Sequence, residues 1–192
     1  MFGRLTMVCS GATAATRQAS FPLEEPLEPR ALALAKAVGR HLRRADRVWV
    51  SPALRAGQTA QALGLQAIEK PALADQDMGA WSGKALAEIS ERQPDGIAAW
   101  LSDPAAAPHG GESLAHVAIR VSALIDSLLT ERGHTMAVTH PAIIRAAVLH
   151  VLGAPLDSFW RIDSEPLSVT EFRSDGRRWA LRSSGVMLAK PD

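Results

Sequence analysis

A buried-strand pattern that stops at a small, polar loop lies near the start of the chain and constrains its fold most. Leu5, Met7 and Val8 form a short apolar run that ends at Ser10-Gly11, and the residues up to Arg17 are small or polar. Such a run without polar alternation is typical of a strand covered on both faces. In open α/β sheets ligands bind beyond the carboxyl ends of the strands, so residues 9–17 are a candidate site. Taken alone, this stretch also fits an ordinary loop.

Two later segments repeat the pattern. An apolar run at 48–50 leads into SPALR (51–55), and another at 136–138 leads into THP (139–141) and then IIR (143–145). In each, a hydroxyl residue closes the strand and a proline fits the first turn of a helix. Three strand ends therefore face one region. Because helix N-termini carry unpaired N–H groups and a partial positive charge, that region suits an anion.

The order of the remaining patterns predicts one fold class. Amphipathic or apolar helices are predicted at 28–44, 52–63, 84–92, 96–101, 113–132 and 141–152, and further strands at 47–51, 67–69 and 135–139. Two β-like runs at 168–172 and 179–183 flank Asp175-Gly176, which predicts an antiparallel hairpin. We therefore expect a three-layer α/β/α sandwich with a mostly parallel central sheet and an antiparallel edge.

Composition limits the domain count and the classes of partner. A length of 192 residues fits one domain over 1–192. The net charge of +1 gives no overall attraction to nucleic acid or to an acidic membrane, and no segment approaches the roughly 20 apolar residues of a membrane span. The single cysteine excludes an intrachain disulfide and a thiolate metal site. We expect a cytoplasmic protein without a metal or cofactor; whether it forms a homo-oligomer is left open.

The order and spacing of several motifs resemble the histidine phosphatase superfamily, the phosphoglycerate-mutase-like proteins, over nearly the whole chain. The matching segments are MVCSGAT (7–13), 27–37, SPALRAGQTAQA (51–62), 75–83, GGESL (110–114) and VTHPAIIR (138–145). In that family a histidine of the first motif is phosphorylated, arginines and a second histidine hold the phosphate, and a carboxylic acid protonates the leaving oxygen. The resemblance implies that Arg55 is the second arginine, His140 the second histidine and Asp75 the proton donor.

The first motif departs from the family pattern. Ser10 stands at the nucleophile position, Cys9 replaces the adjacent arginine, Ala12 replaces an acid and Thr16 replaces an asparagine. A serine hydroxyl needs a base or a metal to ionise it, whereas a neutral imidazole does not. The usual phosphohistidine turnover is therefore expected to be absent.

Three functional hypotheses remain. In the first, the chain binds a phosphorylated or anionic small molecule, with phosphatase activity lost or greatly reduced, through backbone N–H groups after Ser10 and Ser51 and a set of pocket residues. That set is Cys9, Gly11, Thr16, Arg17, Arg55 and His140. In the second, a divergent phosphomonoesterase uses Ser10 or Cys9 as nucleophile, with His140 as base and Arg17 replacing the lost arginine. In the third, the pocket is inert and the chain is an interaction subunit.

Each candidate also has a plainer structural interpretation. Cys9 at a strand end fits a small buried hydrophobe, and His140 alone fits a structural histidine. Asp75 could cap a helix or face water. His109 and His116 are expected to be exposed. Glu112 is expected to cap the long helix or form an ion pair with it, and a role in the pocket is the alternative.

Overall fold

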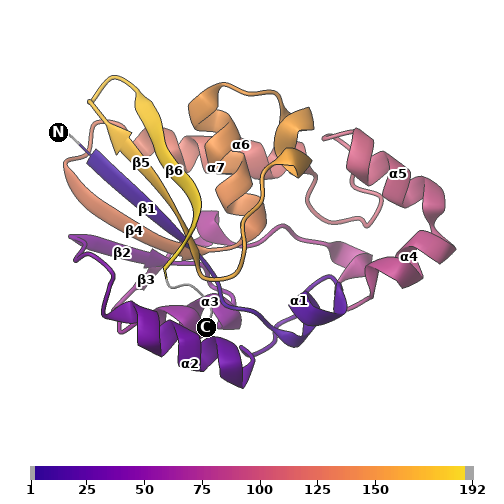
Figure 1. The fold of residues 1–192 in the computed structure, drawn as a ribbon. Helices are drawn as coiled ribbons and strands as arrows, with labels where there is room; N and C mark the ends of the chain where they lie inside the picture. The colour runs from indigo at the N-terminus through magenta and orange to yellow at the C-terminus, as the bar shows by residue number, and fades with distance from the viewer. Residues whose placement is uncertain (1–2, 189–192) are drawn as a thin grey trace.

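A six-stranded sheet organises the computed structural model, which describes residues 3–188 (Figure 1). Its strands lie in the order β3-β2-β4-β1-β5-β6. They are β1 (Gly3–Cys9), β2 (Arg47–Val50), β3 (Ile68–Glu69), β4 (Gly133–Thr139), β5 (Ser168–Ser174) and β6 (Trp179–Met187). Strands β1 to β4 pair in parallel, whereas β5 is antiparallel to β1 and β6 to β5. The mostly parallel sheet with an antiparallel edge is confirmed.

Helices cover both faces of this sheet. The α-helices are α1 (Ala14–Gln18), α2 (Pro29–Gly39), α3 (Leu54–Ala62), α4 (Leu86–Arg92), α5 (Pro94–Ser102), α6 (Leu114–Ser127) and α7 (Pro141–Leu152). Short 3-10 helices are η1 (Pro71–Leu73), η2 (Gly79–Trp81) and η3 (Leu156–Arg161). No helix within residues 3–188 combines the length and apolarity needed to cross a membrane.

The side chains of β1 alternate between the two faces of the sheet and contact a different helical layer on each face. Leu5, Met7 and Cys9 pack into the core cluster that also holds the apolar stripes of α6 and α7. Val8, on the opposite face, packs into a second cluster with the apolar residues of α2 and α3. Successive residues of a strand point to opposite faces, so a strand with apolar residues on both is held between two layers. The three-layer α/β/α sandwich is confirmed.

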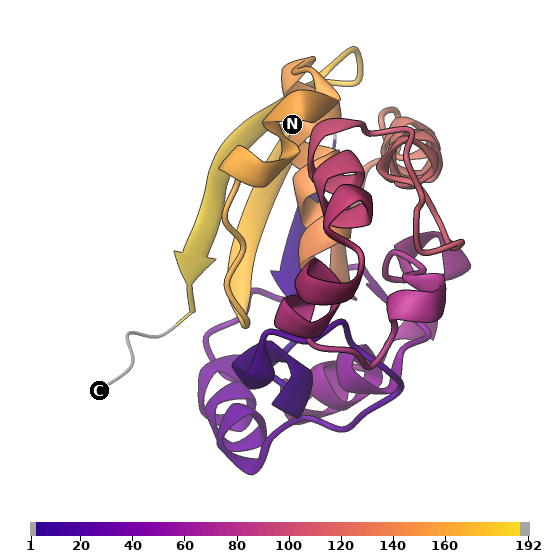
Figure 2. The ribbon, with the colours of Figure 1, turned by 90° about the vertical axis from the view of Figure 1, so that its right-hand side faces the viewer.

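Helices α4 and α5 lie apart from these layers, beyond the carboxyl ends of the parallel strands, and face the viewer in Figure 2. They have their own small core, in which Met78, Trp81 and Ile89 are buried and Phe21 and Trp100 pack against them. The indole of Trp81 also donates a hydrogen bond to Gln93 (2.9 Å).

Two predicted helix ends are wrong, for identifiable reasons. Helix α2 ends at Gly39 rather than at residue 44. At Gly39 the backbone lies so close to Leu63 that a Cβ there would be 2.6 Å from the Leu63 carbonyl oxygen. Helix α6 ends at Ser127 rather than residue 132. In a longer helix the Ile125 carbonyl would accept from the N–H of residue 129, but it accepts from the N–H of Leu128 (3.1 Å) and from the Trp179 indole (3.0 Å). The short helix α1 was not predicted.

Candidate functional site

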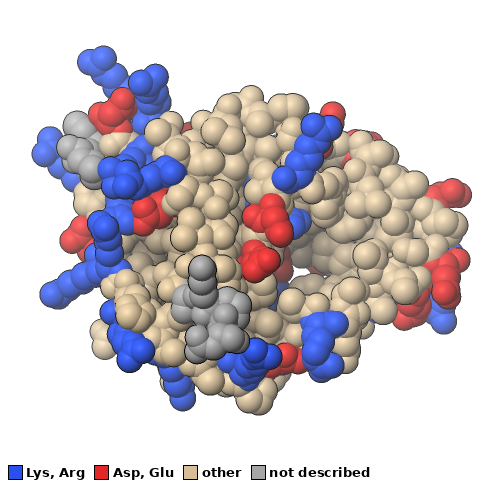
Figure 3. All heavy atoms as spheres, viewed as in Figure 1, with Lys and Arg blue, Asp and Glu red and all other residues tan. Residues whose placement is uncertain are grey.

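A cavity of about 320 Å³ opens at the carboxyl ends of β1 and β4. The space-filling view shows the molecule hollowed between the sheet with its covering helices and the part that carries α4 and α5 (Figure 3). The residues that line it are Cys9, Ser10, Gly11, Thr13, Ala15, Thr16, Ser20, Phe21, Pro22, Arg55, Asp75, Gln76, Met78, Trp100, His140, Pro141, Ala142, Arg145, Phe159, Trp160, Ser164 and Pro166. The predicted meeting of strand ends therefore occurs.

Arg55 and Asp75 form an ion pair on the cavity wall. Arg55, on the first turn of α3, donates from Nη2 to Asp75 Oδ2 (2.6 Å) and from Nη1 to the carbonyl of Leu23 (3.2 Å). Burial raises the pKa of Asp75, but His140 and Arg55 outweigh this effect and hold the pKa below its ordinary value. Asp75 is therefore a carboxylate at neutral pH in the free cavity.

His140 lies at the bottom of the cavity as the N-cap residue of α7 and is fully buried. Its Nε2 shares a hydrogen bond with the hydroxyl of Ser51 (2.7 Å), and its Nδ1 is 3.6 Å from Asp75 Oδ2. Burial lowers the pKa of His140 to about 4, although Asp75 opposes the shift. The imidazole is therefore neutral at pH 7 and is paired with Ser51.

Backbone N–H groups beside the strand ends already donate hydrogen bonds to other parts of the protein. The N–H of Ser10 donates to the carbonyl of Thr139 (2.7 Å), and the N–H of Gly11 donates to the Thr59 hydroxyl (2.9 Å). After Ser51, the N–H of Leu54 is taken by the Glu24 carboxylate. The N–H groups of Gly11 and Leu54, which were expected to be available to an anion, are therefore already paired within the protein.

Cys9 is buried at the end of β1, and its thiol contacts the carbonyl of Ser164 (3.8 Å). Burial raises the pKa of the Cys9 thiol to about 12. The thiol is therefore protonated at neutral pH, and a protonated thiol is a weak nucleophile.

The same family emerges from comparison with known proteins. The model of the histidine phosphatase superfamily (branch 1) matches residues 5–186. The chain belongs to this superfamily.

Individual relatives in the superfamily are named as phosphatases. Phosphoserine phosphatase 1 of Hydrogenobacter thermophilus is 28% identical over 165 residues, which cover 81% of this chain and 78% of that protein. The structure of mycobacterial glucosyl-3-phosphoglycerate phosphatase in complex with VO3 is 27% identical, with a TM-score of 0.85 over 95% of this chain and 98% of that one. A phosphoserine phosphatase mutant from Entamoeba histolytica, at 20% identity and a TM-score of 0.85, shares the fold over 95% of this chain and 96% of its own.

Within this superfamily member, Arg17 does not reach the cavity. Thr13 and Thr16 cap α1 through a reciprocal pair of hydrogen bonds. This short helix directs Arg17 outward, where its Nε donates to Glu28 Oε1 (2.8 Å) and its side chain is 66% exposed. The expectation that Arg17 replaces the lost arginine is therefore wrong, although Thr16 does line the cavity.

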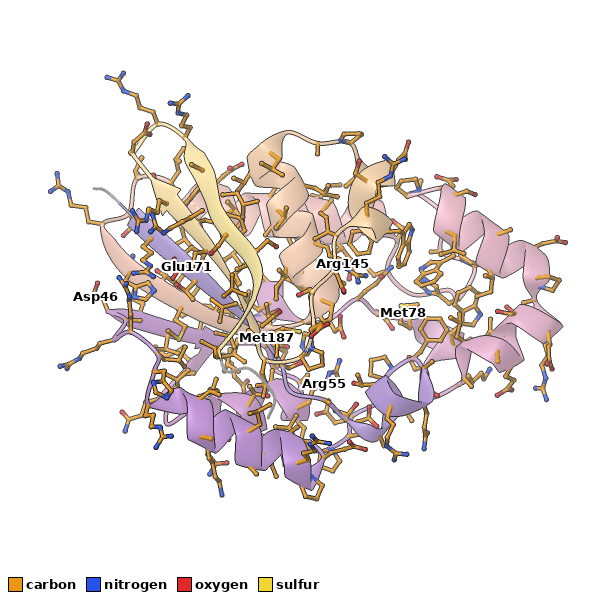
Figure 4. The ribbon with its side chains drawn as sticks, in the orientation of Figure 1. Asp46, Arg55, Met78, Arg145, Glu171 and Met187 are labelled. Carbon is orange, nitrogen blue, oxygen red and sulfur yellow. The ribbon has the colours of Figure 1, made fainter. Side chains whose placement is uncertain are left out.

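Arg145 lines the cavity in its place, and the sequence did not single it out as a site residue. It lies on α7, five residues after His140, with its guanidinium carbon 5.4 Å from the centroid of the Phe159 ring. Figure 4 shows Arg145 and Arg55 approaching the hollow from opposite sides, from α7 and α3 respectively. The available signal was its place little more than one turn after a candidate histidine, on a helix that begins at the site.

A network of hydrogen bonds outside the cavity fixes the loop that carries Asp75. Arg120 donates to both carboxylate oxygens of Glu112 (2.7 and 2.8 Å) and to the carbonyls of Ala72 (2.9 Å) and Asp75 (3.2 Å). Gly111 packs so closely on this loop that a Cβ would lie 2.1 Å from the Asp77 carbonyl oxygen. Glu112 thus pairs with α6 as expected, and the pair positions Asp75.

Aromatic side chains form the outer wall of the cavity. Trp100 and Trp160 contact each other edge to face with ring centroids 4.5 Å apart, and Phe159 contacts Trp160 at 4.9 Å. His109 contacts Trp81 edge to face behind this wall, with ring centroids 5.2 Å apart, and is buried, so the expectation that it is exposed is wrong. His116 is exposed, as expected. The cavity therefore combines a charged floor with an apolar rim.

Proposed function

We propose that this chain binds a phosphorylated or otherwise anionic small molecule in the cavity, with phosphatase activity lost or greatly reduced. One observation carries the proposal: Arg55 and His140, from separate elements, meet around Asp75 on the wall of an open cavity. Arginine is well suited to phosphate because its planar fork donates two parallel hydrogen bonds. The relatives named as phosphatases, one of them in complex with VO3, support an anionic ligand.

The loss of turnover is inferred from the first loop. The family's nucleophile position holds Ser10, whose hydroxyl needs a base. The imidazole of His140 is instead hydrogen-bonded to Ser51. The thiol of Cys9 is protonated at neutral pH because its pKa is about 12. Neither side chain therefore has the activation that a nucleophile requires, which ranks the divergent phosphomonoesterase second.

The inert-pocket hypothesis ranks third. A pocket released from ligand binding is expected to fill with side chains, because voids in a protein interior are costly. Here about 320 Å³ remains open, and both Arg55 and Arg145 line it. An open cavity with charged walls favours a ligand.

Calorimetric titration with inorganic phosphate tests the binding claim. The wild-type chain is expected to bind phosphate, and Arg55→Gln to weaken binding at least about tenfold, as expected for a lost charge-assisted hydrogen bond. Arg92→Gln is the control, because its side chain is 73% exposed on α4 and its partner is Glu88. Absence of wild-type binding at millimolar phosphate would overturn the proposal, and so would equal binding by Arg55→Gln.

Hydrolysis of p-nitrophenyl phosphate tests the claim of lost turnover. The wild-type chain is expected to show little or no hydrolysis above the uncatalysed rate, whereas Cys9→Arg combined with Ser10→His is expected to gain activity. Turnover by the wild-type chain that disappears in Ser10→Ala or Cys9→Ala, but not in Arg92→Gln, would establish the divergent enzyme instead.

A further inference from the structure

The outer wall of the cavity consists of large apolar side chains from segments that lie far apart in the sequence. Its members are Phe21, Met78, Trp100, Phe159 and Trp160. Trp100 lies on α5, residues 159 and 160 lie on η3, and Phe21 lies in the loop between α1 and α2. All except Met78 lie outside the segments that match the family motifs. The shared motifs therefore do not account for this wall.

The rings of the outer wall stand at steep angles to one another. Trp100 contacts Trp160 with an interplanar angle of 65°, and Phe159 contacts Trp160 at 85°. On the other side, Phe21 contacts Trp100 with ring centroids 5.6 Å apart and an angle of 80°. Offset-stacked and edge-to-face contacts are the favourable arrangements of aromatic pairs. Because neighbouring rings lie at steep angles, one further ring can stack on one of them and meet the next edge to face.

Trp100 and Trp160 are not enclosed as core residues are. Both line the main cavity, and both also line a second cavity of about 250 Å³. Trp160 is 38% exposed, whereas Trp81 is fully buried in the small core of α4 and α5. Large aromatic side chains that remain open to a cavity are typical of small-molecule sites.

The indole N–H groups show the same contrast. Trp81 donates from Nε1 to Gln93 (2.9 Å). Within residues 3–188, neither Trp100 nor Trp160 donates its indole N–H to another group of the protein. Tryptophan N–H groups usually have a partner when the ring serves a core. The outer wall therefore carries two donors that the protein itself does not use.

The anion-binding side chains and the outer wall lie on different sides of the cavity. Figure 4 shows Arg55 on α3 and Met78 in the part that carries α4 and α5, with the hollow between them. A ligand that places its phosphate at Arg55 therefore directs its organic group toward the wall. A group rich in hydroxyls would lose hydration against apolar rings without gaining partners for most of its hydroxyls.

We propose that the outer wall is a subsite for an aromatic group, so that the ligand of the cavity is a small aryl phosphomonoester. This assignment rests on the proposed function, because it names the ligand class of the same cavity. The phosphate binds at Arg55, and the ring packs against Trp100 and Trp160. Contact with these rings favours an aromatic group over a saturated one of similar size. An aryl group also differs from the polar serine and glucosyl groups in the names of two relatives.

Calorimetric titration of the wild-type chain with a series of phosphates tests the ligand class. Phenyl phosphate is expected to bind at least about tenfold more tightly than inorganic phosphate, because its ring buries apolar area against the wall. Cyclohexyl phosphate has a similar size but no aromatic face, and it is expected to bind about threefold more weakly than phenyl phosphate. Glycerol phosphate is expected to bind no more tightly than inorganic phosphate.

Substitution of Trp160 tests the residues of the subsite. Trp160→Leu is expected to weaken binding of phenyl phosphate about threefold to tenfold and to leave binding of inorganic phosphate unchanged. Trp160→Phe, which keeps a ring, is expected to retain most of the affinity. Trp49→Leu is the matched control, because it removes the same type of side chain from β2, outside the cavity lining. Circular dichroism checks the fold of each variant, and the ligand series on the wild type decides the ligand class without them.

The outcomes separate the aromatic subsite from the proposed function. Phenyl phosphate that binds no more tightly than inorganic or cyclohexyl phosphate would overturn the aromatic subsite and keep the anion site. Equal losses of phenyl phosphate and inorganic phosphate binding in Trp160→Leu would also overturn it, because Trp160 would then have only a structural role. A phosphotyrosyl peptide that binds more tightly than phenyl phosphate would overturn the assignment to a small molecule. Absence of wild-type binding to any of these phosphates would overturn the proposed function itself.

Discussion

The Arg55 guanidinium donates a 2.6 Å hydrogen bond to the Asp75 carboxylate, on the wall of the cavity where an anion would bind. In the free protein, one donor group of Arg55 is therefore already paired with the negative charge of Asp75. An incoming phosphate must compete with Asp75 for the same guanidinium. The position that the family uses for a proton donor thus carries an ionised acid in the free cavity.

Asp75→Asn is expected to tighten phosphate binding about threefold to tenfold, because it removes a like charge next to the ligand. The same substitution removes the negative charge that pairs with the largely buried Arg55, so the free energy of unfolding should fall by about 1–2 kcal/mol. Calorimetry and urea unfolding measure the two effects. Asp95→Asn, at the exposed start of α5, is the control. Weaker phosphate binding by Asp75→Asn would show that the carboxylate assists the ligand instead.

Acid should destabilise the protein through His140. The ordinary pKa of 6.5 falls to about 4 in the folded chain, so between these values the unfolded state binds a proton that the folded state does not. The free energy of unfolding should therefore decrease as pH falls from 6.5 to 4, by up to about 3 kcal/mol from this group, and change no further through it below pH 4. The lowered pKa of Asp75 adds a loss in the same direction at lower pH.

Urea unfolding of the wild type and His140→Gln across pH 4–7.5 measures the contribution of His140. The glutamine keeps a polar group that can reach Ser51 but has no proton to gain. Between pH 4 and 6.5 the free energy of unfolding should depend less steeply on pH in the variant than in the wild type, by the amount attributed to His140. Parallel curves for the two proteins would contradict a buried, neutral imidazole.

Arg120→Met is expected to lower the free energy of unfolding by about 2–3 kcal/mol, because it leaves Glu112 without its partner and releases the carbonyls of Ala72 and Asp75. The released loop should also weaken phosphate binding. Arg92→Met, which breaks the exposed pair with Glu88, should cost no more than about 0.5 kcal/mol. Equal costs in the two variants would mean that the Asp75 loop does not depend on Arg120.

The Cys9 thiol should react slowly with iodoacetamide in the native protein. A pKa of about 12 instead of the ordinary 9.0 reduces the thiolate fraction at pH 8 by roughly a thousandfold, and burial blocks access further. Mass spectrometry should find labelling in urea but almost none in buffer. Rapid native labelling would indicate an activated thiol and would favour the divergent enzyme.

The sheet and the meeting of its strand ends could be predicted because they depend on local patterns. The apolar runs at β1, β2 and β4 and the prolines that follow two of them specify parallel strands and helix starts. Arg55 and His140 are each within a few residues of a strand end, so the same patterns place them at the site. Their contact with Asp75 needed the family resemblance, since a loop acid has no periodicity.

The rest of the site depends on contacts between distant segments. Arg145 becomes a cavity residue only because η3 and the segment around Ser164 pack over the start of α7. Arg17 was misplaced because the capping of α1 by Thr13 and Thr16 turns its side chain toward Glu28. Tertiary packing decides such orientations, and a sequence pattern of small polar residues does not reveal them.

A crystal structure of the wild-type chain grown in phosphate tests the central claim most directly. A phosphate ion is expected in the cavity, with its oxygens within hydrogen-bond distance of the Arg55 guanidinium and no covalent bond to Ser10 or Cys9. An unoccupied cavity at high phosphate, or a phosphate bound elsewhere on the surface, would contradict it.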